Sequence, residues 1–177
     1  STQAKTLFPY TTLFRSKSCM ELSSLMKKFY GLKQYINLIQ IESSIVKIAF
    51  SKIGTYPLQA IIEQTTDNFE KNFIIFSIKN HILQLSEDCF GTHVIEKIIT
   101  CYDQSSIQFI YDMVIYNFLY LANHMNGLCV VKKAIIHASN QETIDIFKNL
   151  IINNFMKLVQ NPYGNYAIQV AFDVNNN

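Results

Sequence analysis

The sequence predicts an all-α fold, a right-handed α-solenoid of three-helix repeats with about 36 residues in each. The first observation is an internal repeat, because four similar segments follow glycines that are separated by 37, 36 and 37 residues. The second is a helical spacing of apolar residues after each glycine. The third is that five glycines and three prolines in 177 residues leave little material for the turns of an all-β fold. The repeated glycines are Gly54, Gly91, Gly127 and Gly164.

Each of these glycines opens a predicted helix. Apolar residues recur four, seven and eight positions later, which places them on one face of a helix. These columns hold Leu58, Ile61 and Ile62; Ile95, Ile98 and Ile99; Val131, Ala134 and Ile135; and Ile168, Ala171 and Phe172. Apolar residues nine, eight and six positions before the glycine predict a preceding helix. A polar break and a further apolar-periodic run, such as residues 143–152, predict a third.

A three-helix unit of this kind cannot close a core by itself, so its apolar faces are buried only when neighbouring units stack. We therefore expect a repeat domain over residues 17–174 that is truncated at both ends. Its predicted parts are a remnant repeat at 17–41, repeats at 42–80, 81–114, 115–152 and 153–174, and a tail at 175–177.

The first sixteen residues differ in character from the rest of the chain, because they lack helical periodicity. Residues 6–16 resemble, letter for letter, the in-frame translation of a common sequencing-library adapter. We expect residues 1–16 to be a non-native adapter artefact and exclude them from the interpretation of fold and function.

Composition narrows the classes of function. Fifteen Lys and Arg against thirteen Asp and Glu give a net charge of +2, too small to commit the chain to DNA or to a charged membrane surface. The most apolar run, residues 113–122, is shorter than the roughly 20 residues of a membrane span. The four cysteines form no CxxC pair, so we expect neither a zinc site nor a disulfide framework. They are Cys19, Cys89, Cys101 and Cys129.

Catalytic motifs are also missing from the sequence. No Ser/His/Asp grouping, glycine-rich phosphate loop or paired carboxylates stand out. We therefore predict a protein that is not an enzyme, with no cofactor, no metal, no small-molecule substrate and no membrane partner.

A polar and aromatic triplet follows each glycine, at the first, second and fifth positions after it. Positions one and five form an i, i+4 pair on one helix face, and position two lies beside them. Amide, carboxylate and hydroxyl groups can bind the edge of a nucleobase, and a ring can stack on it, which favours single-stranded RNA. The triplets are Thr55, Tyr56 and Gln59; Thr92, His93 and Glu96; Leu128, Cys129 and Lys132; and Asn165, Tyr166 and Gln169.

The segments GTYPLQ (54–59), GTHVIE (91–96) and GNYAIQ (164–169), in units of about 36 residues, resemble Pumilio (PUF) repeats. The resemblance covers about residues 17–174. It implies a crescent, usually of eight repeats, that binds single-stranded mRNA in 3′ untranslated regions. It also implies one base for each repeat, with the RNA antiparallel to the protein.

The resemblance further implies which base each triplet contacts. Asn165 with Gln169 would bind the edge of uracil. Thr92 with Glu96 is similar to the pair that reads guanine. The side chains expected to stack on bases are Tyr56, His93 and Tyr166.

The other two triplets fit the family pattern less closely. Thr55 with Gln59 is nearest to the pair that reads adenine. Leu128 with Lys132 departs from the pattern, because Leu cannot hydrogen-bond a base edge and Lys lacks two-sided geometry. We expect only a weak contact from Lys132, so that its repeat tolerates any base or contacts phosphate.

The predicted function is thus sequence-specific mRNA binding and post-transcriptional regulation of mRNA stability or translation in the cytoplasm. The resemblance implies repressor or deadenylase-recruiting proteins as partners on the convex face. Two alternatives remain. One is a nucleolar relative that binds rRNA with low base specificity, and the other is a protein-binding scaffold similar to armadillo or HEAT arrays, although those repeats do not require the glycine and its triplet.

Overall fold

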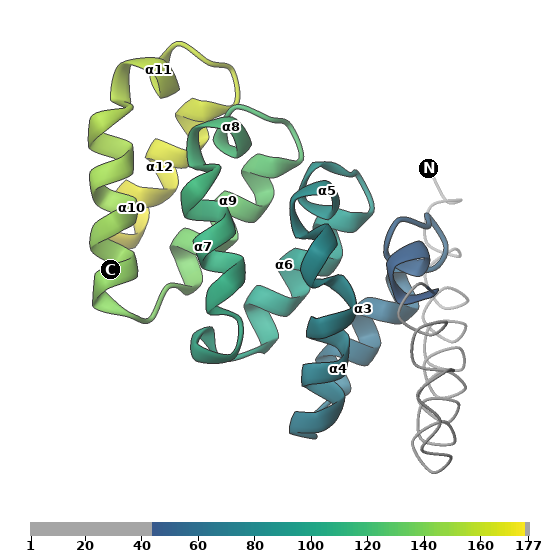
Figure 1. Cartoon of the computed structure of the whole chain (residues 1–177). Helices are drawn as coiled ribbons and strands as arrows, with labels where there is room; N and C mark the ends of the chain where they lie inside the picture. Colours follow the sequence, from purple (N-terminus) through teal and green to yellow (C-terminus); the bar gives the residue numbers. More distant parts are fainter. Residues whose placement is uncertain (1–43, 176–177) are drawn as a thin grey trace, which may run out of the picture. The chain divides into compact units, whose positions relative to one another are not determined.

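The computed structural model describes residues 44–175, and every regular element in this range is helical (Figure 1). The predictions of an adapter artefact at 1–16 and a remnant repeat at 17–41 lie outside the described residues. The chain divides into two compact units, and the boundary falls between Ile78 and Lys79. Each unit is described here by itself.

The described part of the first unit contains one short helix and two longer ones. Residues 44–49 are helical, and they are followed by α3 (Thr55–Gln64) and α4 (Asn68–Ile78). Asp67 begins α4, because its carboxylate accepts hydrogen bonds from the backbone N–H groups of Phe69 and Glu70 at 2.9 and 3.0 Å. The buried apolar side chains of this unit are Ile45, Ala49, Leu58, Ile61, Ile62, Ile74, Ile75 and Ile78.

The second unit carries the remaining helices. They are η1 (Lys79–His81), α5 (Ile82–Glu87), α6 (Gly91–Cys101), η2 (Gln104–Ser106), α7 (Gln108–Tyr116), α8 (Phe118–Ala122), α9 (Gly127–His137), α10 (Gln141–Asn153), α11 (Phe155–Val159) and α12 (Gly164–Asn175). Two complete three-helix repeats, α5 to α7 and α8 to α10, are therefore followed by α11 and α12.

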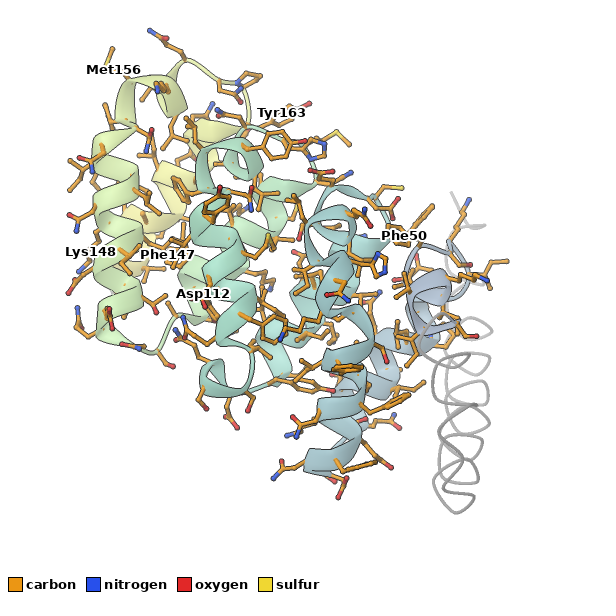
Figure 2. The ribbon with its side chains drawn as sticks, in the orientation of Figure 1. Phe50, Asp112, Phe147, Lys148, Met156 and Tyr163 are labelled. Carbon is orange, nitrogen blue, oxygen red and sulfur yellow. The ribbon has the colours of Figure 1, made fainter. Side chains whose placement is uncertain are left out.

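These repeats stack so that equivalent helices become neighbours. Helix α9 packs against both α6 and α12, and α7 contacts α10 in a second layer (Figure 1). Phe147 of α10 points towards α7, and its ring centroid lies 6.2 Å from that of Phe118, whereas Lys148 projects from the outer side of α10 (Figure 2). Stacking thus buries the apolar faces that a single unit would leave open.

The predicted apolar columns form the core of each stacked repeat. The residues four positions after the glycines are all buried, as are those seven and eight positions after the first three glycines. A column three positions after the glycine is also buried, and the expected columns did not include it; it holds Val94, Val130 and Ala167. In the last repeat, Phe172 of α12 is 62% exposed, although its counterparts Ile99 and Ile135 are buried.

A close approach of two helices explains the repeated glycine. A Cβ atom on Gly91 would lie 2.8 Å from the carbonyl oxygen of Leu85, and one on Gly127 would lie 2.8 Å from that of Leu121. Both leucines belong to the short helix that precedes the glycine helix. Any side chain at the glycine would push these helices apart, so the glycine is required by packing.

Across residues 44–175, no helix is both long enough and apolar enough to cross a membrane.

Candidate nucleic-acid interface

The candidate triplets lie on the first two turns of α3, α6, α9 and α12. A side chain three positions before each glycine helps to begin these helices, because it accepts a hydrogen bond from the glycine N–H. Asp88 accepts from Gly91 at 2.7 Å, and Asn161 accepts from Gly164 at 3.1 Å. Ser51 Oγ and His124 Nδ1 do the same for their own repeats, each at 3.2 Å.

Three of the triplets come together in the second unit, because α6, α9 and α12 are neighbours there. The α3 triplet belongs to the first unit. Tyr56, His93 and Tyr166 are all exposed, so each presents an aromatic ring to solvent. An exposed ring at the same position of successive repeats can stack on successive bases.

Side chains one and five positions after the glycine are already hydrogen-bonded to each other in two repeats. The Gln59 amide donates to the Thr55 hydroxyl at 3.2 Å, and the Gln169 amide donates to Asn165 Oδ1 at 3.4 Å. These bonds hold the two side chains of a pair together. Asn165 and Gln169 can therefore present donors and acceptors jointly to a base edge. Thr55 is only 1% exposed, so Gln59 is the accessible member of its pair.

The α6 triplet is arranged differently. Glu96 lies 3.2 Å from His93 Nδ1, so its carboxylate pairs with the ring at position two. Thr92 is only 3% exposed, and its hydroxyl donates to the backbone carbonyl of Asn126 at 3.2 Å. The expectation that the first triplet position faces away from the core is thus wrong at Thr92, because the following repeat packs over it. It is also wrong at Thr55 and Leu128, which are 1% and 6% exposed. Glu96 and His93 are the accessible members of the α6 triplet.

The α9 triplet offers the least to a base. Leu128 is 6% exposed and packs in the repeat interface, while Lys132 is half-buried. Burial raises the pKa of the Cys129 thiol, the nearby Glu96 carboxylate raises it further, and Lys132 opposes both effects. Glu96 of the α6 repeat and Lys132 of the α9 repeat therefore both lie near Cys129.

The inter-repeat contacts around Asn126 were not predicted. In addition to accepting from Thr92, Asn126 donates through its side-chain amide to the backbone carbonyl of Glu87 at 2.8 Å. Tyr120 of α8 hydrogen-bonds the Glu87 carboxylate, which raises the pKa of Tyr120.

The capping residues three positions before each glycine were also not predicted. Polar residues at this constant distance before each glycine could have indicated them.

Within the described range, no group of three or more His, Cys, Asp and Glu side chains is placed to hold a metal ion. The side chains of the interface can stack on planar groups and exchange hydrogen bonds with them. Together, the fold and this surface define a tandem α-helical repeat protein with one polar and aromatic triplet for each glycine helix.

The sequence model of the Pumilio-family RNA-binding repeat matches residues 81–115, 117–151 and 154–177, more than half of the chain. The chain belongs to the Pumilio (PUF) family of RNA-binding repeat proteins. The family resemblance and the predicted α-solenoid fold class are thereby confirmed. Family and fold are those of RNA-binding repeats rather than of enzymes.

Similar proteins include the Pumilio domain-containing protein C6G9.14 of Schizosaccharomyces pombe, which is 31% identical over 136 residues, covering 77% of this chain and 20% of that protein. The suppressor protein MPT5 of Saccharomyces cerevisiae is 27% identical over 176 residues, covering 95% of this chain and 20% of that protein. The chain thus spans about a fifth of the length of these relatives.

Solved structures show the same fold. The Puf4 RNA-binding domain bound to the HO endonuclease RNA 3′ UTR recognition sequence has a TM-score of 0.71 and 29% identity, covering 75% of this chain and 41% of that one. The RNA-binding domain of yeast Puf5p bound to SMX2 RNA has a TM-score of 0.67 and 26% identity, covering 77% of this chain and 40% of that one.

Proposed function

We propose that the chain binds single-stranded RNA by modular recognition, with one base at each repeat. Membership of the Pumilio family supports this proposal, and so do the structural neighbours that were solved bound to RNA. The observation that carries it is the row of triplets on α6, α9 and α12. The exposed rings of the second unit, His93 and Tyr166, stand at the same position of α6 and α12, and both helices pack against α9.

The proposed base preferences follow from the accessible groups. The hydrogen-bonded pair of Asn165 and Gln169 presents two amides and suits uracil. Glu96 suits guanine, because a carboxylate accepts bonds from two neighbouring N–H groups. In the α3 repeat Gln59, which bonds the buried Thr55, suits adenine. With the strand antiparallel to the protein, the second unit reads 5′-U-N-G-3′.

We further propose mRNA 3′ untranslated regions as the targets, with regulation of mRNA stability or translation as the outcome. Repressor or deadenylase-recruiting proteins would bind the face opposite the triplets, in the cytoplasm. A second candidate is low-specificity binding of rRNA in the nucleolus, which the buried Leu128 and the half-buried Lys132 favour. Crosslinking in cells separates the two, because it would recover either 3′ untranslated regions or rRNA.

Selection from a random RNA library with the 177-residue chain immobilised tests base recognition. Enrichment of uracil two positions before guanine is expected. The Gln169→Glu variant provides the control, because a carboxylate cannot donate to uracil and the uracil preference should be lost. Enrichment without any uracil preference, or equal enrichment by both proteins, would overturn the assignment.

A further inference from the structure

A buried glutamine ties two successive repeats of the second unit together. Gln104, in η2 after α6, is 7% exposed. Its Oε1 accepts hydrogen bonds from the backbone N–H groups of Ser139 and Asn140 at 2.7 and 3.0 Å, and from the Ser139 hydroxyl at 3.1 Å. Its Nε2 donates to the Thr143 hydroxyl at 2.8 Å and to Gln108 at 3.2 Å. All but the last of these bonds lead to the following repeat.

Residues at the same distance from the glycine in two other repeats form local hydrogen bonds instead. Thirteen positions after Gly54 and Gly127 stand Asp67 and Asn140, and each caps its own helix. Asp67 accepts from the N–H groups of α4 at 2.9 and 3.0 Å, and Asn140 accepts from Glu142 of α10 at 2.9 Å. Gln104 is one methylene longer than Asn and bonds residues 35 to 39 positions away. Asp103 stands at the N-cap position of η2, and the Gln104 side chain bonds the following repeat.

The place of the Gln104 hydrogen bonds in the fold gives them a role beyond local stability. Helix α6 has 11 residues and is therefore roughly 16 Å long. At its N-terminal end, Asn126 bonds both Thr92 and the Glu87 carbonyl. At its C-terminal end, Gln104 bonds the loop between α9 and α10. Ties at both ends fix the angle between α6 and α9.

We propose that Gln104 is a positioning residue for RNA binding, which sets the angle between α6 and α9 and thereby the spacing of their base contacts. This inference rests on the proposed function for its RNA readout. His93 and Glu96 lie on one of the two helices, and Cys129 and Lys132 lie on the other. Without the Gln104 hydrogen bonds at the C-terminal end of α6, α9 can tilt about the Asn126 contacts. RNAs with a range of base spacings can then bind.

Gln104 lines a polar pocket of about 460 Å³, together with Thr100, Asp103, His137 and other residues. Water entering this pocket can satisfy the N–H groups that lose Gln104. The most informative variant is Gln104→Asn, because it keeps a polar amide that is one methylene shorter. It should lose the hydrogen bonds to Ser139, Asn140 and Thr143.

The first test measures the geometry alone and needs no RNA. Spin labels carried by unnatural amino acids at the exposed Asp112 and Asn149 report the separation of α7 and α10. Gln104→Asn and Gln104→Ala should broaden the distance distribution. The matched control Asp67→Ala removes two cap bonds of the same kind within one repeat and should leave the distribution as in the wild type. Unchanged distributions for both Gln104 variants would overturn the proposal.

A second test measures the spacing of the RNA bases. The affinities of a short RNA carrying U-N-G and of one with an extra nucleotide before the guanine are compared by fluorescence anisotropy. In the wild type the insertion should weaken binding, and in Gln104→Asn this discrimination should fall by about threefold to tenfold. Asp67→Ala should discriminate like the wild type.

A loss of stability in Gln104→Asn with the wild-type discrimination intact would reduce Gln104 to a structural residue and sink the proposal. Failure of the wild-type chain to bind either RNA would count against the proposed function instead. In that case the distance measurement still decides whether Gln104 fixes the angle between the repeats.

Discussion

Tyr166 and Cys129 stand at the same position of neighbouring repeats, two residues after the glycine, but they offer different chemistry. The phenol ring of Tyr166 is 49% exposed and presents a flat apolar surface. The thiol of Cys129 is half-buried and provides no stacking surface. The interface is therefore uneven along the repeats. Binding energy should be concentrated at repeats with a ring, and each of these two residues allows a separate test.

Replacing Tyr166 with Ala should weaken RNA binding, because the loss of one stacked base costs on the order of 1–3 kcal/mol. Fluorescence anisotropy with a U-N-G RNA measures the change. Tyr116→Ala is the matched control, since Tyr116 is 89% exposed at the end of α7 and should not affect affinity. Tyr166→Phe keeps the ring and should bind nearly as well as the wild type. Equal losses from Tyr166→Ala and Tyr116→Ala would contradict a stacking role.

Cys129 should react slowly with alkylating reagents. Burial raises its pKa, with Glu96 adding to the effect, so less of the reactive thiolate is present at a given pH. Cys89 is exposed and serves as the internal comparison. Mass spectrometry after a brief iodoacetamide pulse at neutral pH should find modification at Cys89 and little at Cys129, with the difference narrowing as the pH rises. Faster labelling of Cys129 would argue against its burial.

At the scale of elements, the glycine helices depend on two features around each glycine. A polar side chain three positions earlier accepts the glycine N–H, as Asp88 does for Gly91. The carbonyl of the preceding helix approaches so closely that no Cβ fits. The first feature begins the helix, and the second fixes how near the short helix packs.

Gly91→Ala should therefore destabilise the protein. Its Cβ would lie 2.8 Å from the Leu85 carbonyl oxygen, and relieving such an overlap costs about 1–3 kcal/mol. Without this overlap, Ala would stabilise the helix by about 0.5–1 kcal/mol relative to Gly. Stabilisation by Gly91→Ala would therefore contradict the close packing. Urea unfolding followed by circular dichroism measures the change. Asn149→Ala, at an exposed site on α10, should leave the midpoint close to that of the wild type.

How much could be predicted from the sequence also differs between elements. The helices and their main core columns follow from periodicity, because residues four, seven and eight positions after the glycine share a face. The column with Val94 and Val130 lies on the same face and could have been included. The capping residues are harder to recognise, since Ser, Asp, His and Asn all serve as acceptors.

The candidate site was predictable in its positions but not in its contacts. Position two after the glycine is exposed at Tyr56, His93 and Tyr166, as a surface aromatic should be. Thr92 is buried because the next repeat covers it, and Gln104 reaches a partner 39 residues away. Contacts between repeats depend on how the repeats pack, and the periodicity of one repeat carries no information about them.

At the scale of the whole molecule, the high apolar content of the sequence is accompanied by exposed apolar side chains. Hydrophobic residues make up 49% of the chain and charged residues 16%, below the roughly 25% of an ordinary domain. Part of that apolar excess lies exposed on the last helices. Phe155 and Phe172 are exposed, although their counterparts Phe118 and Ile135 in the preceding repeat are buried. Exposed apolar surface of this kind promotes association.

We expect the chain to self-associate as its concentration rises, through the face that contains Phe172. Phe172→Glu should increase the monomer fraction, because a charge resists transfer into an apolar contact. Sedimentation velocity over a range of concentrations measures this fraction. Asn149→Glu adds the same charge at an exposed polar site on α10 and should leave association unchanged. Identical sedimentation of the two variants would exclude this face as the contact.

The contacts of Asn126 affect how such arrays could be re-engineered. This residue precedes the glycine of one repeat, yet its carbonyl and amide bind Thr92 and Glu87 of the repeat before it. Shuffling whole three-helix modules would separate these partners and leave a mismatched junction. Chimaeras whose cuts fall outside residues 87–126, so that this stretch is exchanged as one block, would keep the junction intact. The segments of this protein that can be exchanged as one block therefore do not coincide with its three-helix repeats.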